Sequence, residues 1–187
     1  SLEQGKLKEA EISLRNALQI DPKHAQANFD LANVLMNQGE PGKAFQYYQR
    51  TVEADPEHIP ARLRLAVIYS LGNRQQQALD MSQKVLELDP KNVQALLINA
   101  RLLAEQGNMQ SALHKTQKAM DLEPENLQAK IFQSRLLMAA GELDTAEEVL
   151  VQTLALEKDT SQAGYQLASL YARQNKLQEA EKTLVDT

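Results

Sequence analysis

The sequence predicts an all-α solenoid of antiparallel helix pairs, because three features recur along the chain at intervals of 34 residues. The first is an alanine, at Ala10, Ala44, Ala78, Ala112, Ala146 and Ala180. The second is an acidic residue followed by proline, at Asp21-Pro22, Asp55-Pro56, Asp89-Pro90 and Glu123-Pro124. The third is a glycine or asparagine, at Gly5, Gly39, Asn73, Gly107, Gly141 and Asn175. A period of this length is typical of stacked helical repeats and not of one closed core.

The composition fits close helix packing and disfavours nucleic acid as a partner. Of 187 residues, 43% are hydrophobic but only 4% are aromatic, so the core must consist mainly of Leu, Ala, Ile and Val. The formal net charge is −5, and the basic residues are dispersed along the chain. Proteins that bind nucleic acid need clustered Lys and Arg to displace counterions from the phosphates. We therefore expect no nucleic-acid partner.

Cysteine usage and hydropathy bear on the compartment. The chain has no cysteine, which excludes a disulfide framework and a thiolate metal site. This fits the cytoplasm and leaves the periplasm and the extracellular space open. Apolar runs such as 136–140 are far shorter than the roughly 20 residues that span a bilayer. We expect a soluble cytoplasmic or periplasmic protein that is not inserted directly into a membrane.

The first predicted helix covers residues 6–20. Its apolar residues have helical spacing: Leu7, Ala10, Leu14, Ala17 and Leu18. Asp21-Pro22 ends this helix, because proline disfavours helical geometry in the residue before it. Residues 1–24 therefore correspond to the second helix of a truncated repeat, which favours a piece excised from a longer array.

Four full repeats and one shorter repeat follow. Their boundaries are 25–58, 59–92, 93–126, 127–160 and 161–187. Each begins with a helix of about 14 residues that ends at a Gly or Asn turn, where a left-handed residue closes the helix. A second helix then carries the recurrent alanine. Short connections make neighbouring helices antiparallel, so the sequence predicts eleven helices in a single array over 1–187.

The repeat pattern resembles the tetratricopeptide repeat over essentially the whole chain. The shared features are a Leu-Ala-x-x-Leu/Tyr first helix, a Gly turn, an Ala-x-x-x-aromatic/Leu second helix and a closing Pro. The resemblance implies a right-handed solenoid whose first helices line a concave face that holds peptide segments or partner helices. The Gln-rich, Cys-free and loosely conforming repeats look more like bacterial arrays than eukaryotic co-chaperones.

Three departures from the family pattern stand out. The early Trp of the pattern is replaced throughout, by Asn28, Arg62, Leu96, Lys130 and Gly164. Asn99 and Gln133 stand where packing normally requires Leu. Lys158 replaces the closing Pro. These departures make the third and fourth full repeats less ideal without changing the predicted fold.

No catalytic constellation is visible in the sequence. The chain contains no HExxH, no Gly-rich phosphate loop and no Gly-x-Ser-x-Gly elbow. His24 and His58 are one period apart, which favours a capping or turn role over metal binding. His114 and the carboxylates Glu147-Glu148 lie among basic residues, as solvated groups do. We expect a protein that is not an enzyme and that needs no metal or other cofactor.

Two rows of residues on the first helices are the candidate partner-binding face. One row is Phe29, Leu63, Leu97, Ile131 and Tyr165, with Ile98 and Phe132 beside it. The second row lies four residues later on the same helix face and includes Asn33, Val67, Arg101 and Arg135. Either these residues pack helix against helix, or Leu97, Ile131 and their neighbours form an exposed apolar groove. In the groove, Arg101 and Arg135 would pair with carboxylates of a partner that has apolar anchors.

Two further patterns refine this hypothesis. For Asn99 and Gln133 we expect satisfied inter-helix hydrogen bonds, since a buried amide needs partners; the alternative is a polar ladder that holds a peptide backbone. Some members of the family clamp chaperone tails with Lys, Arg and Asn on the first helices. The matching positions here are Phe29, Asn33, Arg64, Gln94 and Ile98. Only Asn33 agrees, so we do not expect a chaperone-tail clamp.

The sequence leaves three classes of function open. The favoured one is an interaction scaffold that captures a partner segment, of the kind found in bacterial factors for pilus, secretion or exopolysaccharide-export assembly. The alternative is a spacer or self-assembling segment, in which apolar terminal helices associate through Leu7, Leu14, Leu18, Leu177, Leu184 and Val185. The third is a protein whose catalytic domain lies outside these residues.

Overall fold

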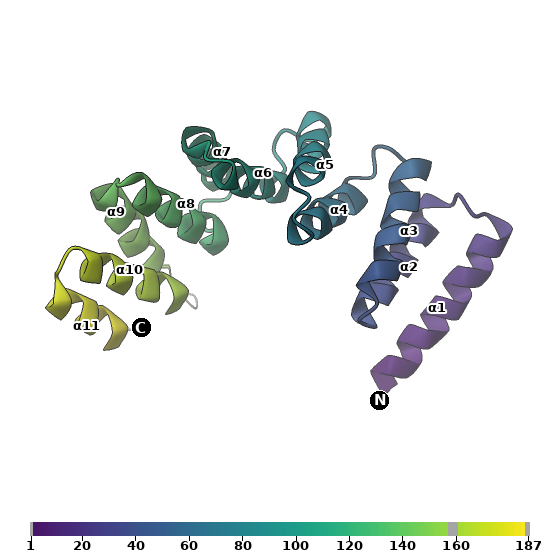
Figure 1. Ribbon diagram of the computed structural model, residues 1–187. Helices are drawn as coiled ribbons and strands as arrows, with labels where there is room; N and C mark the ends of the chain where they lie inside the picture. The colour runs from purple at the N-terminus through teal and green to yellow at the C-terminus, as the bar shows by residue number, and fades with distance from the viewer. Residues whose placement is uncertain (1, 157–160, 186–187) are drawn as a thin grey trace. The chain divides into compact units, whose positions relative to one another are not determined.

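In the computed structural model, the described residues 2–156 and 161–185 form α-helices joined by short turns (Figure 1). The helices are α1 (Leu2–Ile20), α2 (Ala25–Asn37), α3 (Pro41–Ala54), α4 (Ile59–Leu71), α5 (Gln75–Leu88), α6 (Val93–Glu105), α7 (Met109–Leu122), α8 (Leu127–Ala140), α9 (Leu143–Leu154), α10 (Ser161–Arg173) and α11 (Leu177–Val185). The all-α prediction and the helix count are confirmed. The helix expected at 6–20 begins earlier, at Leu2, and so includes Gly5. Lys158 lies outside the described residues.

The turn inside each helix pair has one geometry that repeats five times. Its central residue has a positive φ of 56° to 82°, at Gly39, Asn73, Gly107, Gly141 and Asn175. The next backbone N–H donates to the carbonyl five residues earlier at 2.8–2.9 Å, on Leu35, Tyr69, Leu103, Leu137 and Tyr171. This is the Schellman arrangement, which pairs carbonyls that the helix end leaves without partners. The recurrent Gly or Asn is therefore required by the backbone conformation.

The turn between pairs is built by the acidic residue and by the residue that precedes the next helix. In two of these turns the aspartate carboxylate accepts a hydrogen bond from the backbone N–H two residues later. Asp21 accepts from Lys23 at 3.1 Å, and Asp55 accepts from Glu57 at 3.0 Å. Four side chains then cap the first helix by accepting its third N–H at 3.0–3.2 Å: His24, His58, Asn92 and Asn126. The capping role expected for His24 and His58 is confirmed.

The chain divides into two compact units, residues 1–90 and 91–187. In the first unit each of α1 to α4 packs against the next helix, and in the second unit each of α6 to α10 does so, with α8 also against α10. The alanines of the second helices are fully buried at Ala44, Ala78, Ala112 and Ala146. The larger core side chains include Leu31, Leu35, Tyr48, Leu65, Leu96, Leu102, Leu150 and Leu170. Within the described residues, no helix is long and apolar enough to cross a membrane.

At two of the positions where the family pattern has Trp, a polar side chain makes a different stabilising contact. Asn28 is 1% exposed, and its Nδ2 donates to the carbonyls of Pro22 and His24, both at 3.0 Å. In the next repeat the buried Arg62 donates through Nε to the carbonyl of Pro56 at 2.7 Å. Each side chain thus connects its first helix to the turn that closes the preceding repeat. Burial lowers the pKa of the Arg62 guanidinium.

Enlarging a buried alanine should destabilise the second unit. Ala112→Leu adds three carbons at a site with no exposed surface, so we expect a loss of about 1–3 kcal/mol in the free energy of unfolding. Urea denaturation followed by circular dichroism measures this loss. Ala139→Leu, at an exposed site on α8, is the matched control and should change stability by less than about 0.5 kcal/mol. Equal effects at the two sites would contradict the assignment of Ala112 to a packed contact.

The left-handed turn residue should resist substitution even though space surrounds it. A Cβ at Gly141 would meet no atom within 4 Å, but its φ of 82° strains any L-residue. Gly141→Ala should therefore lower the unfolding free energy by about 1–2 kcal/mol. Gly42→Ala places the same methyl group in equally open space within α3 and should leave stability unchanged or raised. A comparison of the two unfolding midpoints separates backbone strain from crowding.

Candidate partner-binding face

In the first unit the predicted rows are largely occupied by packing. The ring of Phe29 lies 4.8 Å from the ring of His58 and 5.8 Å from that of Tyr48. Asn33 accepts a hydrogen bond from the Tyr48 hydroxyl at 2.7 Å, and burial raises the pKa of that hydroxyl. Of the predicted residues on α4, Leu63 is buried, whereas Val67 is exposed. These residues therefore leave only a small apolar surface on α2 and α4.

Two predicted anchor residues are not exposed. Leu63 is 8% and Ile131 is 3% exposed, so each contributes to the core of its own unit. The expectation that Ile131 lines an open groove is wrong for this reason. At these two positions, the helix-packing alternative describes the side chain correctly. The same position of the repeat is not buried everywhere. On α10 it is occupied by Tyr165, which is 70% exposed.

In the second unit the two arginines of the predicted face are accessible to solvent. Arg101 on α6 and Arg135 on α8 are both exposed, and neither has an ion-pair partner among the described residues. The Arg135 guanidinium lies 5.4 Å above the ring of Phe132, a cation–π contact that orients the side chain. Leu97, Ile98 and Phe132 are half-buried, so part of each apolar side chain still faces solvent.

The first helices α8 and α10 lie against one another in this unit. The Ser134 hydroxyl donates to the Gln166 Oε1 at 2.8 Å across the two helices. This contact places the exposed Tyr165 on the helix next to the one that carries Arg135. Together these residues present unpaired positive charge beside aromatic surface. Such a surface suits a segment that offers a carboxylate to Arg and an apolar side chain to the rings.

The two polar replacements of the first-helix Leu differ in their hydrogen bonding. Asn99 and Gln133 are both buried, at 1% and 6% exposure. The Gln133 Oε1 has no hydrogen-bond partner among the described residues, so the expected satisfied contact is not found there. Asn99 is not among the side chains that lack a partner. A peptide ladder formed by both amides stays a hypothesis.

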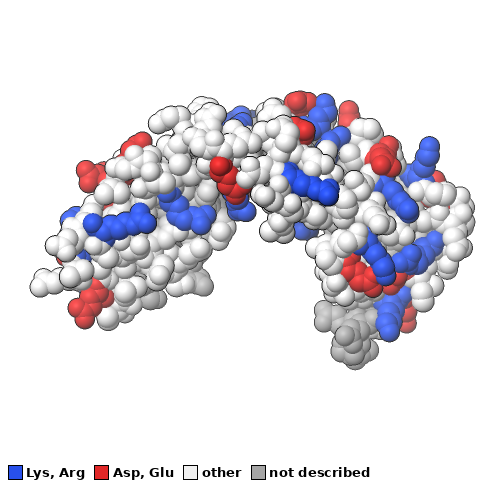
Figure 2. All heavy atoms as spheres, viewed as in Figure 1, with Lys and Arg blue, Asp and Glu red and all other residues white. Residues whose placement is uncertain are grey.

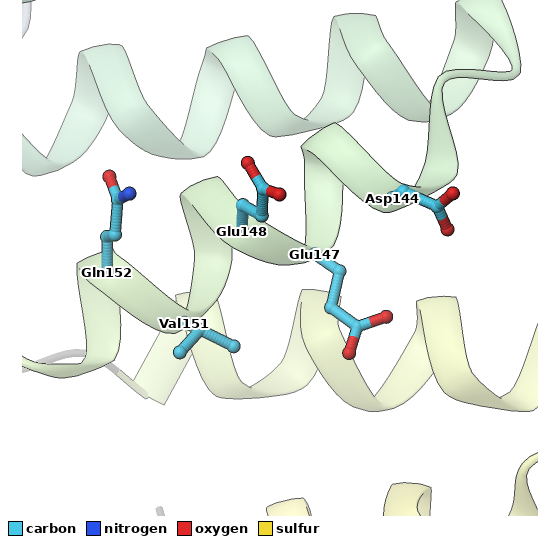
Figure 3. Close-up of a pocket in the computed structure, with 5 residues that line it drawn as sticks. All are labelled: Asp144, Glu147, Glu148, Val151 and Gln152. Carbon is cyan, nitrogen blue, oxygen red and sulfur yellow. The ribbon is translucent and has the colours of Figure 1, made fainter.

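A hollow that the sequence did not reveal lies along α9, with a volume of about 420 Å³. Asp144, Glu147, Glu148, Val151 and Gln152 line it, and Figure 3 shows that these side chains come from one helix and spread over several directions. Glu147 is not simply solvated, because its carboxylate accepts from the Tyr171 hydroxyl at 2.9 Å and lies 3.7 Å from the Lys176 ammonium. Burial, followed by this hydrogen bond, raises the pKa of Tyr171. Among the described residues, no cluster of three or more His, Asp or Glu side chains is placed so that it could hold a metal ion.

The visible charge is finely mixed. Figure 2 shows Lys and Arg in small separate groups, with Asp and Glu between them, on the face in view. His114 is exposed on α7, as expected of a solvated residue.

Comparison with known proteins identifies the repeat. Three models of the tetratricopeptide repeat match residues 2–59, 60–92 and 103–165. No curated protein sequence matches the chain.

Several solved structures share the fold at low sequence identity. PilF from Pseudomonas aeruginosa is 19% identical, with 99% of this chain and 82% of that chain covered and a TM-score of 0.79. YrrB, described as a TPR protein with an unusual peptide-binding site, is 20% identical over 91% and 88% of the two chains, with a TM-score of 0.72. MamA from Desulfovibrio magneticus is 19% identical over 83% and 88%, with a TM-score of 0.73. At these identities the likeness establishes the fold alone.

Replacing the unsatisfied amide should stabilise the protein. Gln133→Leu removes a buried carbonyl oxygen without a partner and restores an apolar side chain, so we expect a gain of about 1 kcal/mol in unfolding free energy. Gln128→Leu, on the exposed side of the same helix, should stay within about 0.5 kcal/mol of the wild type. Chemical denaturation of both variants measures the difference. A clear loss of stability in Gln133→Leu would show that the amide makes a favourable contact.

Proposed function

Because the chain belongs to the tetratricopeptide repeat family, we propose that it is a non-catalytic interaction scaffold that captures a segment or helix of a partner protein on its first helices. One observation carries this proposal: Arg101 and Arg135 stand one repeat apart, exposed and without ion-pair partners among the described residues. Exposed arginines beside aromatic rings are typical of binding surfaces. The proposed site comprises these two arginines with Leu97, Ile98, Phe132 and Tyr165.

The chemistry of the site favours a partner segment with carboxylates and apolar anchors. Each guanidinium can form two parallel hydrogen bonds to a carboxylate, and the half-buried Ile98 and Phe132 can accept apolar side chains. In the first unit, the exposed Val67 is a separate candidate contact for a partner, and Phe29 and Asn33 support their own helix through their contacts with Tyr48. Leu63 and Ile131 would act from the core by holding their helices in place.

The biological setting we propose is the assembly of a larger bacterial complex, such as a pilus, a secretion system or an exopolysaccharide exporter. The fold that the chain shares with PilF supports this setting only at the level of architecture. The second candidate function is a spacer or self-assembling segment. It is favoured by exposed apolar side chains on α11, where Leu177 is 64%, Leu184 is 54% and Val185 is 80% exposed.

Charge reversal at the two arginines should abolish capture of the partner. In a pull-down from a bacterial lysate, the wild type should retain a protein that Arg101→Glu/Arg135→Glu does not retain, because the site then repels carboxylates. Lys118→Glu/Lys182→Glu is the matched control, since both lysines are exposed on second helices of the same unit and the change in charge is equal. Retention of the same proteins by all three forms would refute the first-helix site. If none is retained, the spacer function is favoured.

A further inference from the structure

A hollow of about 350 Å³ lies in the first unit, away from the predicted rows. It is formed where the start of α3 meets the end of α4 and the turn that leads into α5. Its lining residues are Pro41, Gly42, Phe45, Ile68, Tyr69, Gly72 and Arg74. Most of these side chains are apolar, and the volume is within the range of about 300–1,000 Å³ that is usual for ligand pockets.

Two aromatic rings give the hollow a fixed wall. The ring of Phe45 meets the ring of Tyr69 nearly edge-on, with centroids 5.4 Å apart and an angle of 84° between the planes. The Tyr69 hydroxyl accepts a hydrogen bond from Gln49 Nε2 at 3.4 Å, and Tyr69 as a whole is 8% exposed. Phe45 and Ile68 are half-buried, so they retain surface for another apolar group. A third ring can join this pair in the tilted geometry that aromatic clusters prefer.

A positive charge stands at the edge of this apolar wall. Arg74 is exposed immediately before α5 and has no ion-pair or hydrogen-bond partner for its side chain among the described residues. Its guanidinium is therefore available to a carboxylate that approaches the hollow, and Arg pairs carboxylates through two parallel hydrogen bonds.

A glycine keeps one side of the hollow open. Gly42 lies in the first turn of α3, where a Cβ would meet no atom within 4 Å. The helix therefore does not need glycine for packing at this position, and a larger side chain would extend into free space along the hollow.

We propose that this hollow is a second docking site, which takes one aromatic side chain from an acidic segment of a partner protein. The aromatic side chain packs against Phe45 and Tyr69, and a carboxylate next to it in the partner's sequence pairs with Arg74. Buried aromatic anchors of this kind supply most of the affinity in many interfaces. The site is built from α3, the end of α4 and the turn before α5, so it does not depend on the arginines of the proposed first-helix face.

The test uses a short Glu-Trp-Glu peptide that is blocked at both ends. The chain contains no Trp, so tryptophan emission reports on the probe alone. With the wild type we expect a saturable blue shift as the indole leaves water. Gly42→Leu should weaken binding more than tenfold by filling the hollow. Gly5→Leu, also at a helical glycine in open space, should bind like the wild type. Circular dichroism of both variants verifies that the helices are intact.

The charge component is tested separately. Arg74→Gln should weaken binding about two- to fivefold, the range expected for an exposed ion pair, whereas the exposed Arg64→Gln should have no effect. A Gln-Trp-Gln probe should bind the wild type as weakly as the acidic probe binds Arg74→Gln.

Equal binding by Gly42→Leu and Gly5→Leu, or no saturable shift with the wild type, would overturn the proposal. Equal binding of the two probes would overturn the role of Arg74. The Arg101→Glu/Arg135→Glu protein should bind the probe normally, so failure of the first-helix site is distinguishable from failure of this one.

Discussion

The reversal of the chain inside each helix pair depends on one residue with a left-handed backbone conformation. With a positive φ at Gly39 or Asn73, the next N–H can reach back to the carbonyl of Leu35 or Tyr69, and the two helices then run antiparallel at close distance. That proximity is possible because the second helix presents an alanine without exposed surface. The short turn and the small side chain therefore act together. Neither would produce a packed pair alone.

Much of the fold could be predicted because its determinants are local. The turns, the caps and the ends of helices each depend on a few neighbouring residues, and the sequence repeats them at a constant interval. The start of α1 was less predictable. Gly5 has the same place in the repeat as Gly39, but it continues a helix and does not reverse the chain. A glycine permits a left-handed turn without imposing one.

The candidate sites were less predictable, since exposure is a property of three-dimensional packing. Ile131 and Tyr165 are equivalent in the repeat, yet one is buried and the other is mostly exposed. The unpaired state of Arg135 likewise depends on which carboxylates the neighbouring helices bring near it. The hollow beside Phe45 and Tyr69 is lined by residues from different repeats, and no local sequence pattern predicts it. Sequence periodicity identifies helix faces but not what covers them.

The four caps between the pairs differ between the two units in one respect. Both histidine caps, His24 and His58, belong to residues 1–90, whereas the asparagine caps, Asn92 and Asn126, belong to residues 91–187. The imidazole accepts through its Nδ1, whereas the amide accepts through its Oδ1, and in all four caps the donor is the third backbone N–H of the helix. A histidine cap also brings a ring to the start of the helix: the ring of His58 packs against Phe29 with centroids 4.8 Å apart, a contact that an asparagine cap cannot make. The same cap geometry is reached with two kinds of side chain, and only the histidine adds an aromatic surface to it.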